Sequence, residues 1–75
     1  MRVEQIAYAQ KAAGQYRVTY QHEAGLASEV VILVADQIKM AFQLFHTATD
    51  EEAFELALKY QTKNPAKRLI EFSRI

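Results

Sequence analysis

The chain has 75 residues, of which 51% are hydrophobic and 24% are charged, and it contains no cysteine. A chain of this length folds as one small domain with little room for an internal ligand cavity, and without cysteine it forms neither a disulfide framework nor a zinc ribbon. Nine basic and nine acidic residues give a net charge of zero, so no overall field draws the chain to nucleic acid.

Signals for membrane insertion or export are missing from the sequence. The longest uninterrupted apolar run, Val30 to Ala35, is far shorter than the ~20 residues that span a bilayer. The N-terminal residues have no continuous apolar stretch of the signal-peptide type. No repeat or linker divides the chain. We therefore expect a complete cytoplasmic protein that forms a single domain over residues 1–75 and does not bind membranes.

The first predicted strand is marked by Tyr16, Val18 and Tyr20, which alternate with polar residues and so share one face. If residues 12–14 form a hairpin loop, an earlier strand precedes it, with Ile6 opposite Tyr20. The competing interpretation of residues 1–13 is a short helix, because most of them are good helix formers and the glycine after them can end a helix. We favour the hairpin because it aligns apolar residues on one face.

A second strand is predicted after a turn at Gly25, where a mostly β-branched run begins that is too short for a helix. With the loop centred on Gly25, Val30 would lie opposite Tyr20. Val30, Ile32 and Val34 would then join the apolar face of the sheet, and the residues between them would point away from it.

Two helices are predicted next. Asp36 can accept a hydrogen bond from the free amides of a helix that runs to about His46, although residues 37–45 also alternate as a strand does. Thr49 and Glu52 form a capping box for a second helix, which must end before the only proline. The core face of this second helix would consist of Ala53, Leu56, Ala57 and Tyr60, with Phe54 and Leu58 on one shoulder.

The tail, residues 67–75, again alternates and predicts a terminal strand, whose place in the sheet the pattern leaves open. The predicted fold class is α+β. A small, mainly antiparallel sheet, made of a three-stranded meander and the C-terminal strand, would carry one or two helices on one face.

Residue patterns of known catalytic sites are absent. The sequence has no glycine-rich phosphate loop, no nucleophile elbow and no pair of histidines at helical spacing. The carboxylates at positions 50, 51, 52 and 55 are explained by the positive end of a helix dipole. We therefore expect no catalytic residue, no metal site and no cofactor, and a protein that is not an enzyme.

The C-terminal end concentrates positive charge, which supports an alternative function. A nucleic-acid-associated accessory protein would meet an anionic partner through this basic cluster. We consider nucleic-acid binding the weaker hypothesis, because Glu71 lies among these residues and no nucleic-acid-binding motif accompanies them. The cluster consists of Lys59, Lys63, Lys67 and Arg68.

The surplus of apolar residues is the most informative feature. Each predicted helix has an apolar arc of roughly 200°, wider than the ~100° stripe that a surface helix needs. Such a surplus favours self-association or a partner over a tightly wrapped monomer. We therefore expect a non-catalytic protein–protein interaction module, an adaptor, inhibitor or regulator, that forms a homodimer. The expected contact residues are Val31, Leu33, Met40, Leu44, Phe54 and Leu58.

Overall fold

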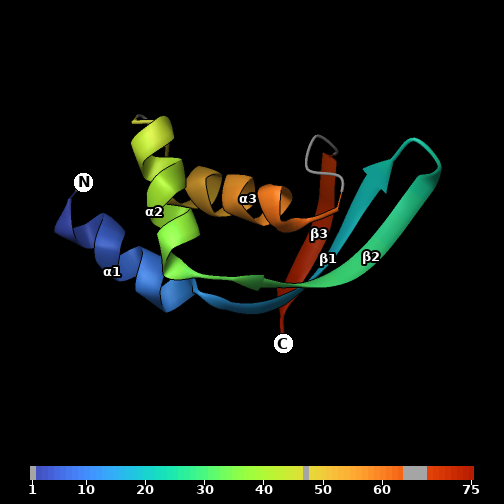
Figure 1. The fold of residues 1–75 in the computed structure, drawn as a ribbon, viewed down its shortest axis with the longest axis horizontal. Coiled ribbons are helices and arrows are strands. Elements are labelled where there is room, and N and C mark those ends of the chain that lie inside the picture. The colour runs from blue at the N-terminus through green and yellow to red at the C-terminus, as the bar shows by residue number, and fades with distance from the viewer. Residues whose placement is uncertain (1, 47, 64–67) are drawn as a thin grey trace.

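A computed structural model describes residues 2–46, 48–63 and 68–75 of the chain (Figure 1). Its elements in chain order are α1 (Val3–Ala12), β1 (Gly14–His22), β2 (Gly25–Leu33), α2 (Ala35–Leu44), α3 (Asp50–Gln61) and β3 (Arg68–Arg74). The α+β class is confirmed, but the described residues form three helices rather than one or two. None of these helices has the length and apolar character needed to span a bilayer.

The N-terminal segment is a helix, so the predicted hairpin at residues 6–20 is wrong. At the start of α1, the Gln5 side chain accepts a hydrogen bond from the backbone N–H of Arg2 at 3.0 Å. Ala9 and Ala12 are buried in the core. The Tyr16 hydroxyl donates a hydrogen bond to the carbonyl of Ala12, which holds the end of α1 against β1. These tertiary contacts select the helix over the strand that the apolar pattern also allowed.

The β1–β2 hairpin is present, but its register differs from the predicted one. Its turn contains only two residues between His22 and Gly25, and Gly25 has a φ of 123°, which glycine adopts without strain. Tyr20 therefore lies opposite Ala27, three residues away from the expected Val30. An odd shift in register turns each side chain of a strand to the other face of the sheet.

The shift corrects the predicted core face of β2. Val31 and Leu33 point into the core, and Leu33 is only 1% exposed. Val30 and Ile32, which were expected in the core, are 53% and 61% exposed, and Val34 is also exposed.

Both predicted central helices are confirmed. In α2 the first turn is stabilised by the Gln37 side chain, which accepts from the backbone N–H of Val34 at 3.1 Å, so the helix is capped two residues before the expected Asp36. In α3 the Thr49 hydroxyl accepts from the Glu52 N–H at 3.2 Å, and the Glu52 carboxylate accepts from the Thr49 N–H at 2.9 Å. The capping box at the start of α3 therefore forms as expected.

The terminal strand β3 pairs antiparallel with β1, which gives the sheet order β2-β1-β3. It takes the place beside β1 that the prediction assigned to an N-terminal strand. The backbone N–H of Ile75 extends this pairing by donating to the carbonyl of Gln15 at 2.9 Å. The register shifts between Thr19 and Tyr20, so the ladder is irregular near the turn end of β1.

The core lies between one face of the sheet and the helices. Figure 1 shows α2 between α1 and α3, while the turn end of the β1–β2 hairpin projects beyond the helices. Tyr16 packs edge-on against Phe54 with ring centroids 5.1 Å apart. The predicted core face of α3 is corrected in three places, because Tyr60 is 63% exposed whereas Phe54 and Leu58 are buried. The largest fully buried side chains are Val18, Leu33, Ile38 and Leu58.

Candidate interaction surface

The structure divides the six predicted contact residues into two groups. Four of them, Val31, Leu33, Phe54 and Leu58, are buried in the core and offer no surface to a partner. Met40 and Leu44, on α2, are 57% and 64% exposed. Val31 and Leu33 belong to the core because the helices cover the face of β2 that was expected to be free. Phe54 and Leu58 belong to it because they lie on the buried side of α3.

Met40 and Leu44 line a shallow groove between α2 and α3. The groove has a volume of about 260 Å³, and its walls are mainly apolar. Phe45 and Tyr60, which were not among the predicted contact residues, are exposed at the same groove. The residues that line it are Gln37, Met40, Ala41, Leu44, Phe45, Ala57, Tyr60 and Gln61. Since none of these side chains is charged, the groove suits apolar contact.

A second hollow of about 290 Å³ lies between the start of α1 and the end of α2. Its wall is more polar, with Arg2, Gln5, Gln43 and His46 around Phe42. Gln5 already bonds the backbone of Arg2, so part of this polar lining serves the start of α1.

The face of the sheet opposite the helices is not covered by any of the described residues. On β1 this face is polar, and the hydroxyls of Thr19 and Ser28 form a hydrogen bond of 2.9 Å across the β1–β2 pair. On β2 it carries Leu26, Val30 and Ile32, all exposed. The prediction missed these side chains because alternation alone does not say which face is buried. The short turn before Gly25, which sets the register, is the signal that identifies them.

The two edges of the sheet differ in charge. Arg68, Glu71 and Arg74 place three exposed charges on β3. The only charged residue of β2 is Glu29, and its carboxylate accepts a hydrogen bond from the Tyr20 hydroxyl at 2.8 Å on the core side. Charges and irregular pairing keep sheet edges from joining other strands, so β3 is protected and β2 is much less so.

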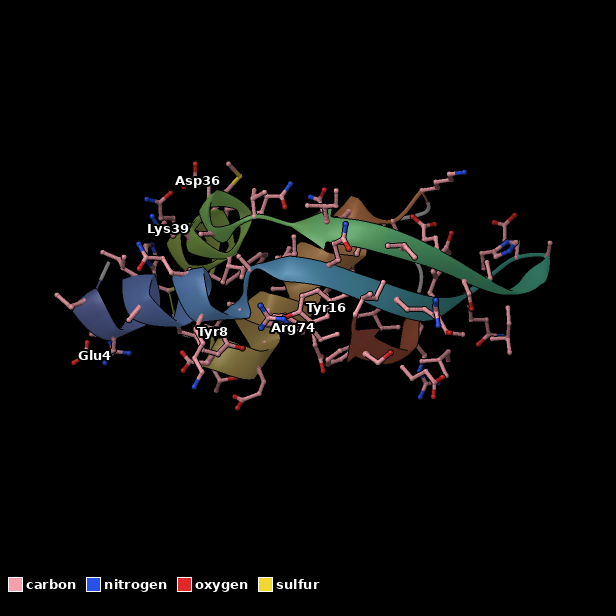
Figure 2. The ribbon with its side chains drawn as sticks, turned by 90° about the horizontal axis from the view of Figure 1, so that it is seen from below. Glu4, Tyr8, Tyr16, Asp36, Lys39 and Arg74 are labelled. Atoms are coloured by element: carbon pink, nitrogen blue, oxygen red, sulfur yellow. The ribbon has the colours of Figure 1, made fainter. Side chains whose placement is uncertain are left out.

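Arg74 also has a structural role (Figure 2). Its guanidinium donates to the carbonyl of Lys11 at 3.0 Å and to that of Ala13 at 2.8 Å, and it lies 5.8 Å from the centre of the Tyr16 ring. A cation that bonds the last carbonyls of a helix satisfies acceptors that the helix itself leaves free. Arg74 therefore ties the C-terminal strand to the end of α1.

The predicted basic cluster is only partly described, because Lys67 lies outside the described residues. Lys59 is half-buried, and Lys63 and Arg68 are exposed. The backbone N–H of Lys63 donates to the Glu29 carboxylate at 3.4 Å, which brings a negative charge beside the cluster. The described residues of the cluster therefore do not form an uninterrupted positive surface.

Shifts in pKa occur where the fold itself supplies a cause. Burial, followed by the nearby carboxylates of Asp50 and Glu51, raises the pKa of the Tyr8 phenol. Hydrogen bonds with Thr49 lower the pKa of Glu52. Among the described residues, no three His, Cys, Asp or Glu side chains gather as metal ligands would.

No protein-family model, curated protein or solved structure shows significant similarity to this chain.

Proposed function

We propose that the chain is a non-catalytic protein–protein interaction module, an adaptor, inhibitor or regulator, that works as a homodimer. The observation that carries this proposal is the amount of large apolar surface outside the core. Monomeric soluble proteins rarely expose extended apolar patches, and such patches mark sites of protein association. The exposed large apolar side chains among the described residues are Val3, Leu26, Val30, Ile32, Val34, Met40, Leu44, Phe45, Tyr60, Ile70, Phe72 and Ile75.

The position of these side chains supports association rather than a looser core. Val18, Leu33 and Leu58 are fully buried between the sheet and the helices, whereas Val30 lies on the other face of the sheet and cannot join them by a small movement. Seven of these twelve side chains lie on two surfaces, four at the groove between α2 and α3 and three on the outer side of β2. Covering such surfaces removes apolar area from water, which is the main favourable term in protein association.

The test is the molar mass in solution. Size-exclusion chromatography with light scattering, run over a range of micromolar concentrations, should give a mass that approaches twice the 8.6 kDa of one chain. Added sulfate should preserve or strengthen the association, because it favours apolar burial. A mass near 8.6 kDa at every concentration would refute the homodimer.

A further inference from the structure

We propose that two copies of the chain pair along β2, antiparallel about a two-fold axis at Val30, and join their sheets into one continuous sheet. The inference rests on the proposed homodimer and assigns its contact to the free edge of β2. The groove between α2 and α3 then remains open on each copy.

The backbone of β2 has unpaired groups at this edge. The bond from the Ile75 N–H to the Gln15 carbonyl shows that Gln15 directs its backbone toward β3. In an antiparallel ladder, successive residues direct their backbone N–H and C=O groups to opposite edges of the strand. Tyr16 therefore directs its backbone groups toward β2, where Val31 is its partner. The alternate residues of β2 therefore direct their N–H and C=O groups away from β1. These residues are Leu26, Ser28, Val30 and Ile32.

An unpaired strand edge is best completed by another strand, since only a strand offers donors and acceptors at matching intervals. β2 is nine residues long, contains neither lysine nor proline, and pairs with β1 without a register shift. The exposed side chains of its outward residues carry no charge. A second copy of β2 presents the same uncharged and mainly apolar row, so the two edges are complementary to each other.

Among centres at Ser28, Glu29 and Val30, charge and apolar contact favour Val30. Two β2 edges form hydrogen bonds only through the residues whose backbone groups point away from β1. One strand can therefore shift along the other only by two residues at a time. A dimer centred on Glu29 would place two carboxylates directly opposite each other, which is destabilising. A dimer centred on Ser28 would place Ile32 of one copy opposite the hairpin turn of the other copy, where it has no strand residue to pair with. The centre at Val30 pairs Val30 with Val30, Ile32 with Ser28, and Glu29 with Val31.

Single cysteines test this register, because the chain has no cysteine of its own. Facing residues in an antiparallel pair have Cα atoms about 5 Å apart, which a disulfide can bridge. Val30→Cys should therefore give a disulfide-linked dimer under mild oxidation. Ile32→Cys alone should not, because its two copies would be offset by four residues, about 13 Å along the strands. A mixture of Ile32→Cys and Ser28→Cys should cross-link.

A charge variant provides the second test. Val30→Glu would place two carboxylates face to face in the dimer, while Arg17, its neighbour on β1, accommodates the new charge within one chain. This variant should retain its circular dichroism spectrum and have a mass near 8.6 kDa. The matched control is Leu44→Glu, an exposed residue of the groove, which should remain a dimer.

The outcomes separate this inference from the proposed function. A monomeric unmodified protein overturns both. A dimer that persists in Val30→Glu, or that Leu44→Glu dissociates instead, overturns the β2 contact and leaves the homodimer standing. Equal cross-linking by Val30→Cys and Ile32→Cys alone also overturns the proposed register. Selective cross-linking together with loss of the dimer in Val30→Glu supports it.

Discussion

Leu33 and Ile32 are neighbours on β2 whose surroundings are opposite, and replacing each by alanine tests the register of the hairpin. Leu33 is 1% exposed and packs in the core, whereas Ile32 is 61% exposed on the uncovered face. A register in which Val30 lies opposite Tyr20, as the apolar alternation predicts, would reverse these two environments. The pair of variants therefore distinguishes the two registers within one strand.

The expected magnitudes are well separated. Truncating a fully buried leucine to alanine costs about 2–5 kcal/mol, from lost apolar burial and from the cavity that remains. A domain of this length has a total stability of about 4–11 kcal/mol, so Leu33→Ala should remove a large part of it and can unfold the chain. Ile32→Ala changes an exposed side chain and should alter the free energy of unfolding by no more than about 0.5 kcal/mol.

Urea unfolding followed by circular dichroism measures both values. The titrations need several protein concentrations, because any contribution from self-association changes with concentration and the stability of one chain does not. The reasoning would be refuted if Ile32→Ala were as destabilising as Leu33→Ala at the lowest concentration. An unfolded Leu33→Ala beside a stable Ile32→Ala would agree with the observed register.

Four further predictions concern the ends of elements and the basic cluster. Thr49→Ala should cost about 0.5–2 kcal/mol in urea unfolding and should raise the lowered pKa of Glu52 toward 4.5, as measured by NMR titration. Because the pKa of Glu52 is lower in the folded state, its contribution to stability is complete above pH 4.5 and is lost as the pH falls through the pKa of the folded state. Glu52→Gln should remove this pH dependence of stability. Arg74→Ala should cost about 0.5–1.5 kcal/mol and speed amide exchange at the end of α1, while an unchanged exchange rate there would contradict its role. At physiological salt the protein should show no specific oligonucleotide binding by fluorescence anisotropy. A sub-micromolar complex that Lys63→Ala and Arg68→Ala weaken would instead favour nucleic-acid binding over the protein–protein interaction module.

Features that depend on neighbouring residues were predictable from the sequence. Thr49 and Glu52 are three positions apart, and their capping box marks the start of α3 without reference to the rest of the chain. The alternation of Tyr16, Val18 and Tyr20 likewise identified β1 and its buried face. The same kind of local pattern predicted β2, α2 and β3, and with them the α+β class.

Choices between locally similar alternatives were made only by the tertiary structure. Residues 3–12 could form a helix or a strand, and contacts from distant parts of the chain, such as Arg74 bonding the carbonyl of Lys11, stabilise the helix. With α1 helical, the position beside β1 is occupied by β3. The alternation of β2 fits either register equally well, and the short turn together with helix packing places Leu33 inside and Ile32 outside. Because a period of two defines two faces but not which one the helices cover, the identity of the exposed apolar surface depends on the complete fold.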